Sequence, residues 1–170
     1  MGTDMHANVE VTEAVEHRRW VTAFAEVQFA RDYPLFSLLA GVRSESTGVP
    51  AMFAPRGLPA DASIDTRGRL ELDVDDELAA VECEHACSKA QAEEWVAKGV
   101  TGYVAADRSR IFDPDAFAVS WLSTEDVGRV LDQYNENWRS QPLELAATLA
   151  AMRTFEAAGC KARLVMWFRH

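Results

Sequence analysis

The pattern of hydrophobic and polar positions predicts strands at both ends of the chain. Residues 7–12 alternate between the two classes, as a strand with one buried face does. Residues 20–27 are apolar on both faces, which is typical of a central strand, and the charged residues 13–19 would form the hairpin connection between the two. The apolar run at residues 162–168 predicts a buried strand. Pairing of the first and last strands would bring His170 near the N-terminus.

The middle of the chain predicts one further strand and a long loop. Residues 69–74 alternate strictly, with Leu70, Leu72 and Val74 on the inward face. Residues 102–112 have the pattern of a short hairpin or an edge segment. Residues 44–66 are irregular and rich in glycine and proline, and loops of this length in a domain are usually functional or mobile.

Four segments have helical signals. A short helix is predicted to begin at Pro34 and to end at Gly41. Ser88 has capping-box spacing at the start of a second helix, and Ser123 begins a third. Pro142 opens the last helix, which carries an apolar stripe.

The order of these elements predicts an α+β fold. Strands and helices do not alternate steadily, so we expect a mixed or antiparallel sheet packed by about four helices. A length of 170 residues fits one domain over residues 1–170. No apolar run approaches the roughly 20 residues of a membrane span, and we expect neither a membrane span nor a secretory leader. With three cysteines, an odd number, it fits a reducing compartment, and we expect it in the cytoplasm.

The charge is acidic and unevenly distributed. Residues 1–85 hold 16 acidic and 7 basic residues, against 11 and 10 in residues 86–170, for a net charge of −10. Such a surface repels the nucleic-acid backbone, so direct DNA or RNA binding is not expected. The charge would suit a basic partner, or an inhibitor that mimics nucleic acid, or it serves solubility alone.

An Asp-x-His pair stands at the start of the first predicted strand. Side chains two apart in a strand share a face, so Asp4 and His6 could hold one metal ion or one polar ligand. A metal site needs at least a third ligand. The candidates are His85, Cys83, Cys87, His170, Asp113 and Asp115. The alternative is that Asp4 is an exposed turn acid and His6 a strand-edge residue. The sequence requires no cofactor.

The Cys83-x-His85-x-Cys87 segment has spacing typical of metal ligands. Zinc sites usually pair such a cluster with a second one, and only Cys160 remains elsewhere. We therefore favour a loop with semi-buried thiols before the helix at Ser88.

Arg56 lies in the long loop between Pro55 and Gly57. A guanidinium on such a stiffened, closely approaching backbone suits a phosphate or a carboxylate. The alternative is a structural arginine that ties the loop to backbone carbonyls or to the acidic strand. Ser120 and Trp121 precede the helix at Ser123, and Trp121 is expected to pack inward.

Several short segments, in the same order along most of the chain, carry a resemblance. They are residues 1–6, 33–43, Pro-Arg-Gly-Leu-Pro at 55–59, Asp-Pro-Asp at 113–115, Ser-Trp-Leu at 120–122, and 164–168. Together they resemble a family of small uncharacterised proteins carried by bacteriophages and prophages, which implies no particular activity. The family pattern starts with Cys-Asp-x-His and has a histidine shortly before Ser-Trp-Leu. Here Thr3 replaces the cysteine, and Phe117 and Ala118 stand near the histidine position. The resemblance thus implies that two plausible metal ligands are missing.

These observations favour a phage-type accessory protein of the bacterial host cytoplasm. We expect it to bind a host protein or a small anionic or phosphorylated ligand, with counter-defence as a natural setting, and we assign no catalytic residue. The candidate binding residues are Asp4, His6, Arg56, Ser120 and Trp121. The first alternative is a metal-dependent hydrolase with Asp4 and His6 as ligands. The second is an acidic inhibitor that mimics nucleic acid. An open sheet edge or an apolar face on the last helix could support a homodimer, and no membrane partner is expected.

Overall fold

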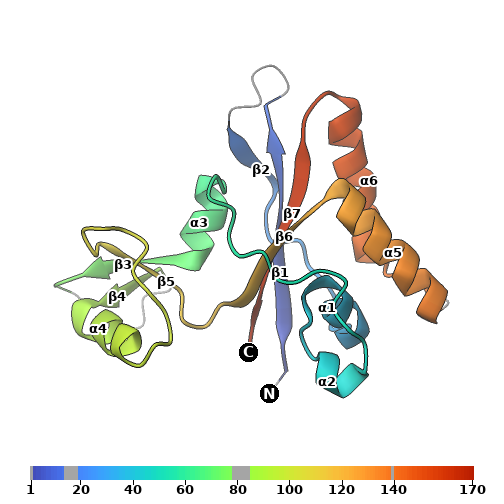
Figure 1. Cartoon of the computed structure of the whole chain (residues 1–170). Helices are drawn as coiled ribbons and strands as arrows, with labels where there is room; N and C mark the ends of the chain where they lie inside the picture. The colour runs from blue at the N-terminus through green and yellow to red at the C-terminus, as the bar shows by residue number, and fades with distance from the viewer. Residues whose placement is uncertain (1, 14–18, 78–84, 139) are drawn as a thin grey trace. The chain divides into compact units, whose positions relative to one another are not determined.

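The computed structural model describes residues 2–13, 19–77, 85–138 and 140–170 (Figure 1). Its contacts divide the chain into two compact units, Met1–Ser63 with Phe117–His170 (unit 1) and Ile64–Ala116 (unit 2). The α+β class is confirmed, with one antiparallel sheet and one mixed sheet. That residues 1–170 form a single domain stays a prediction. Among the described residues, no helix is long and apolar enough to cross a membrane.

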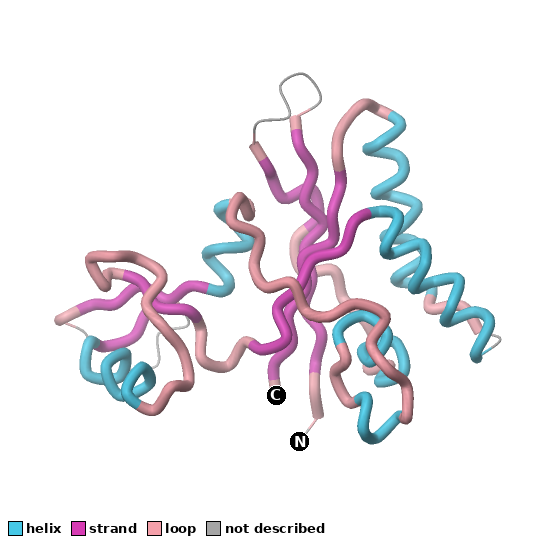
Figure 2. Tube along the Cα trace, viewed as in Figure 1, coloured by secondary structure: helices cyan, strands magenta, loops and turns pink. Residues whose placement is uncertain are grey.

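The sheet of unit 1 joins the two ends of the chain. Its strands are β1 (Asp4–Thr12), β2 (Trp20–Phe24), β6 (Phe117–Ser123) and β7 (Ala162–Arg169), in the spatial order β2-β1-β7-β6. β1 and β7 pair antiparallel along nearly their whole length, from Asp4 opposite Arg169 to Val11 opposite Ala162. The pairing considered for the first and last strands is therefore correct, and it forms the centre of the sheet (Figure 2).

The prediction that the second strand is central is wrong, because β2 lies at the edge of the sheet. Its apolar residues on the outer face are only partly covered, and Phe24 is 47% exposed. Trp20 explains part of the two-sided apolar pattern. Its indole ring packs against the guanidinium of Arg163 rather than inside an apolar core. A two-sided apolar pattern thus arose here from an aromatic–cation contact and not from burial on both faces.

The helices α1 (Tyr33–Ala40), α5 (Thr124–Trp138) and α6 (Leu143–Ala157) cover one face of this sheet. The short helix α2 (Ser44–Thr47) contacts α1 and has no buried residue. The core contains the alternate residues of β1 and β7 that face these helices, together with apolar residues from α1, α5 and α6. α1 begins where predicted, because the Asp32 carboxylate accepts a hydrogen bond from the Leu35 amide, and it ends at Gly41, which has a positive φ of 73°.

A long segment without regular structure covers the other face. Residues 48–63 run across the strands, as Figures 1 and 2 show. The Gly57 amide donates to the Val119 carbonyl at 3.0 Å, and the Ser63 amide donates to the Glu10 carboxylate at 2.8 Å. The predicted loop at residues 44–66 is therefore partly correct, but it begins with α2 and runs into α3 (Ile64–Leu70).

A buried ion pair holds this segment to the sheet. Glu10 and Arg163 lie directly opposite each other on β1 and β7, with N–O distances down to 2.7 Å and side chains that are 0% and 6% exposed. Arg163 also donates to the Asp61 carboxylate at 2.7 Å, and its guanidinium lies 3.8 Å from the centre of the Trp20 ring. One guanidinium therefore connects β1, β2, β7 and the long segment.

Unit 2 is a small mixed sheet. β3 (Glu71–Asp75) lies between β4 (Ala86–Ser88), which is parallel to it, and β5 (Arg110–Phe112), which is antiparallel. The helix α4 (Lys89–Ala97) begins with the predicted capping box at Ser88. The predicted strand at residues 69–74 is correct but starts later, because α3 continues to Leu70. All four predicted helices are confirmed as α1, α4, α5 and α6, and the described residues add α2 and α3.

Most of the net negative charge of the chain lies in unit 2. Residues 64–116 hold 13 acidic and 6 basic residues, so unit 2 contributes −7 of the net −10. The core of this unit consists of Cys87, Ala92 and Ile111 with partly buried apolar neighbours. Cys87 is thus a buried apolar residue, whereas His85 is exposed and Cys83 lies outside the described residues.

Replacing Arg163 tests the ion pair. We expect Arg163→Ala to lower the free energy of unfolding by about 3–5 kcal/mol, because Glu10 would remain buried without its partner. The measurement is urea denaturation followed by circular dichroism. Lys161→Ala removes an exposed charge next to the same strand and should change stability by less than about 0.5 kcal/mol. Equal effects of the two substitutions would show that the buried pair is not important for stability.

Candidate functional site

Three of the predicted binding residues come together. The Arg56 amide donates to the Ser120 hydroxyl at 3.1 Å, and Nη1 of Arg56 donates to the Trp121 carbonyl at 3.2 Å. The guanidinium lies 4.9 Å from the Trp121 ring centre and 5.2 Å from that of Phe53. Trp121 is half-buried, and one face of its ring packs against this cation rather than inside the core.

The contacts of Arg56 match the structural alternative. Its Nη1 also forms an ion pair with Asp126 at 2.7 Å, and Asp126 belongs to the first turn of α5. Ser123 and Asp126 exchange hydrogen bonds between side chain and backbone, which caps this helix. Arg56 therefore ties the long segment to the start of α5, and its charge is already balanced by a carboxylate.

The electrostatics of Asp126 agree with this role. Partial burial raises the pKa of Asp126, but the hydrogen bond from Arg56 and those from Ser123 outweigh burial and hold the pKa below its ordinary value of 3.8. The carboxylate form is thus favoured by folding. The pair stabilises unit 1 only while Asp126 is ionised.

Asp4 and His6 lie on one face of β1 but have separate partners. Asp4 accepts two hydrogen bonds from Arg31, from Nε at 2.6 Å and from Nη2 at 2.9 Å. His6 stacks on Trp167, its partner on β7, with ring centres 5.8 Å apart and planes 11° apart. In the described part of the chain, no group of three or more His, Cys, Asp or Glu side chains is arranged to hold a metal ion.

A pocket elsewhere in unit 1 was missed by the sequence analysis. It has a volume of about 370 Å³ and is formed by the residue before β1, the turn after α1, the start of β6 and the residue after β7. We call it the Arg43 pocket. Its lining residues are Thr3, Ala40, Gly41, Val42, Arg43, Phe117, Ala118 and His170.

Arg43 is held in place at the rim of this pocket. Its Nε and Nη2 donate to the hydroxyl of the fully buried Thr3 at 3.3 Å and 3.0 Å. The guanidinium also lies 5.6 Å from the centre of the Tyr33 ring. The side chain of Arg43 is nonetheless well exposed to solvent, so its charge is accessible. Here a positioned cation faces an open cavity.

The backbone of the pocket is strained at two positions. Arg43 has φ of 64° and Ala118 has φ of 48°, and Ala118 lies in the irregular stretch of β6 between Phe117 and Ser120. In the described residues, four non-glycine residues have positive φ, and two of them line this pocket. Such conformations cost about 1–3 kcal/mol each and are concentrated at functional sites.

Two aromatic rings also line the pocket. Phe117 and His170 stack with ring centres 4.6 Å apart and planes 21° apart. His170 is exposed to solvent. The pocket therefore combines a guanidinium, a hydroxyl and an aromatic surface, which are suited to an anion attached to a planar or apolar group.

The sequence contained partial signals for this pocket. Residues 33–43 belong to the segments of the phage-family resemblance, and Thr3, Phe117 and Ala118 are the positions at which the chain departs from that pattern. All three of these residues line the pocket. No protein-family model, curated protein or solved structure matches the chain.

The role of Arg56 is tested by stability. We expect Arg56→Ala to lower the free energy of unfolding by about 2 kcal/mol, because it removes a hydrogen bond to a charged group and two aromatic contacts. Urea denaturation measures this loss, and Arg153→Ala, which removes an exposed arginine from α6, is the control. Unchanged stability together with loss of anion binding would identify Arg56 as a ligand-binding residue instead.

The lowered pKa of Asp126 predicts a pH dependence. A carboxyl group whose pKa is lowered by folding stabilises the protein above its ordinary pKa of 3.8, and this contribution is lost as the pH falls through the lower pKa of the folded state. We therefore expect the stability difference between wild type and Asp126→Asn to shrink as the pH falls below about 4. Urea unfolding at several pH values measures it, with Asp132→Asn on the same helix as the control. A difference independent of pH would contradict the Arg56–Asp126 pair.

Proposed function

We propose that the chain is a phage-type accessory protein of the bacterial cytoplasm that binds a small anionic or phosphorylated ligand in the Arg43 pocket. Counter-defence is the setting that we infer for it, from the phage-family resemblance. The main observation in support is that Arg43 and Ala118 line the same cavity. Both are non-glycine residues with positive φ, and they come from distant segments of the chain. Without a functional constraint, such strain is readily removed by substitution with glycine.

The chemistry of the pocket supports an anion. Arg43 brings a permanent positive charge, and its planar group is suited to phosphate and carboxylate oxygens. Arg43 lines this cavity, whereas the guanidinium of Arg56 forms an ion pair with Asp126. The volume of about 370 Å³ lies within the range typical of small-molecule sites. These features favour the Arg43 pocket over the Arg56 region as the binding site.

The lining residues support binding rather than catalysis. Catalytic sites usually hold a nucleophile or an acid–base group that a second group orients. In the described lining of the Arg43 pocket, the Thr3 hydroxyl bonds Arg43 and the imidazole of His170 stacks on Phe117. The partners of these two groups are a cation and an apolar ring, which position them without activating them.

Replacement of Arg43 tests the proposed function. The probes are inorganic phosphate and phenyl phosphate, titrated against the full chain labelled with ¹⁵N and followed by chemical-shift changes. We expect both to shift signals around the Arg43 pocket, with phenyl phosphate binding more tightly because its ring meets the aromatic surface. Arg43→Ala should weaken phosphate binding about tenfold or more, the value of a lost charge-assisted hydrogen bond.

Two controls complete this test. Arg43→Lys keeps the charge and should retain part of the affinity, whereas Arg153→Ala should leave the affinity unchanged. Thermal unfolding of each variant shows whether the fold is intact. Unchanged affinity in Arg43→Ala, or shifts clustered only around Arg56, would contradict anion binding in the Arg43 pocket.

A further inference from the structure

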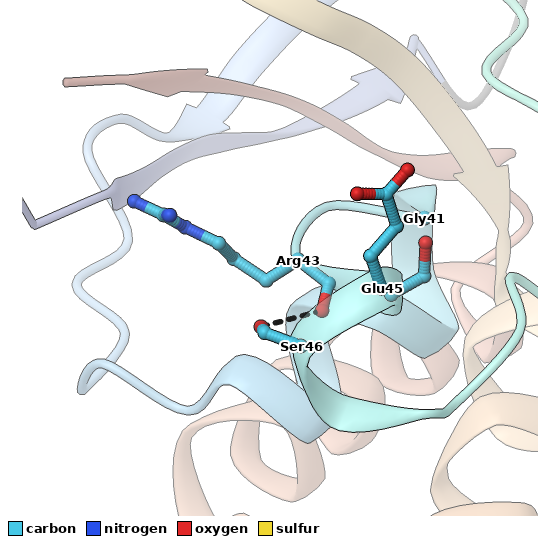
Figure 3. Close-up of a pocket in the computed structure, with 5 residues that line it drawn as sticks. Gly41, Arg43, Glu45 and Ser46 are labelled. Atoms are coloured by element: carbon cyan, nitrogen blue, oxygen red, sulfur yellow. Dashed lines mark hydrogen bonds between the residues drawn. The ribbon is translucent and has the colours of Figure 1, made fainter.

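A second cavity adjoins the Arg43 pocket. It has a volume of about 320 Å³ and is lined by Gly41, Arg43, Ser44, Glu45 and Ser46 (Figure 3). We call it the Glu45 pocket. The two pockets share Gly41 and Arg43, which belong to the turn between α1 and α2. A ligand that contacts Arg43 therefore borders both pockets.

The two pockets present different chemistry. Figure 3 shows that the side chains of Arg43 and Glu45 extend in different directions from the start of α2. Glu45 is exposed, and it provides a carboxylate in a cavity whose other polar side chains are Arg43 and two serines. A carboxylate repels phosphate, but it accepts hydrogen bonds well from hydroxyl groups. A phosphate is therefore favoured on the Arg43 side, and hydroxyl groups on the Glu45 side.

The turn between α1 and α2 is firmly anchored. The Ser37 hydroxyl, buried in α1, donates to the Val42 carbonyl at 2.9 Å and lies 2.8 Å from the Thr47 hydroxyl of α2. The Ser46 hydroxyl donates to the Arg43 carbonyl at 2.9 Å. These bonds fix the backbone from which both charged side chains start. The backbone of the turn is thus in place before a ligand binds, which lowers the entropic cost of binding.

We propose that the ligand is a sugar phosphate, with its phosphate in the Arg43 pocket and its sugar hydroxyls on Glu45, an assignment that rests on the anion-binding function proposed above. The shared chemistry is a phosphate ester next to vicinal hydroxyls. It occurs in free sugar phosphates and in nucleotides, whose base would in addition contact the Phe117–His170 stack. The carboxylate of Glu45 is the feature that an inorganic anion would not use.

The test compares ligands that differ by one group. The full chain is titrated with inorganic phosphate, ribose 5-phosphate, adenosine monophosphate and 2-aminoethyl phosphate. We expect ribose 5-phosphate to bind about tenfold more tightly than inorganic phosphate, because its hydroxyl groups donate hydrogen bonds to the charged carboxylate of Glu45. Glu45→Ala should abolish this gain without weakening the binding of inorganic phosphate. Arg43→Ala should weaken both.

Two further variants sharpen the result. Glu45→Gln keeps an oxygen that accepts hydrogen bonds from hydroxyls, so it should retain much of the gain for ribose 5-phosphate. Glu144→Ala removes an exposed glutamate from the first turn of α6, as Glu45 lies in the first turn of α2, and should change nothing. Tighter binding of adenosine monophosphate that Phe117→Leu abolishes would indicate a nucleotide, and equal binding would indicate a free sugar phosphate; both results support the assignment.

The outcomes that overturn the sugar phosphate differ from those that overturn anion binding. If inorganic phosphate binds through Arg43 but ribose 5-phosphate binds no more tightly, the anion site stands and the sugar assignment is wrong. If 2-aminoethyl phosphate shows the larger gain and Glu45→Gln abolishes that gain, Glu45 recognises an ammonium group instead. If no phosphate compound binds through Arg43, the proposed function itself is wrong.

Discussion

The buried ion pair between Glu10 and Arg163 is the interaction on which the arrangement of unit 1 depends. Two opposite charges face each other across the central pair of strands, and both are nearly inaccessible to water. Burial of such a pair is favourable only when its remaining hydrogen-bonding capacity is satisfied. The Ser63 amide satisfies Glu10, while Asp61 satisfies Arg163 and Trp20 covers it. The long segment must therefore cross this face of the sheet, because it supplies Asp61 and Ser63.

The course of that segment distinguishes the two arginines singled out in unit 1. Arg56 lies where the segment reaches β6, and its guanidinium is used to hold the crossing in place through Asp126 and Trp121. Arg43 lies before the segment starts, in the turn after α1, and it lines the Arg43 pocket. The two residues look alike in sequence, each next to glycine or a tight turn. Their neighbours in space give Arg56 a structural role, and they underlie the proposal that Arg43 binds a ligand.

The proposed binding site brings residues from both chain ends and from the middle of the chain together. Both strands of the antiparallel pair β1–β7 are followed or preceded by a residue that lines the Arg43 pocket. Thr3 and His170 lie close together because the register places Asp4 opposite Arg169. The bulge in β6 then turns Phe117 and Ala118 toward the same cavity. A bulge at such a place re-aims side chains at the cost of local pairing. The strain at Arg43 and Ala118 is consistent with a backbone shaped for a site rather than for stability alone.

The sequence by itself determined much of the secondary structure, because its signals are local. The Asp32–Pro34 start and Gly41 stop of α1, the Ser88 and Ser123 caps, and the apolar run of β7 each depend on a few neighbouring residues. Tertiary structure alone decided the edge position of β2, the helices α2 and α3, the pairing of Arg56 with Asp126, and the Arg43 pocket. Each of these depends on residues about 20 to 170 positions apart, or on short segments whose propensity is weak. No local pattern reports which distant side chain will neutralise a charge, and that choice separates a structural arginine from a binding one.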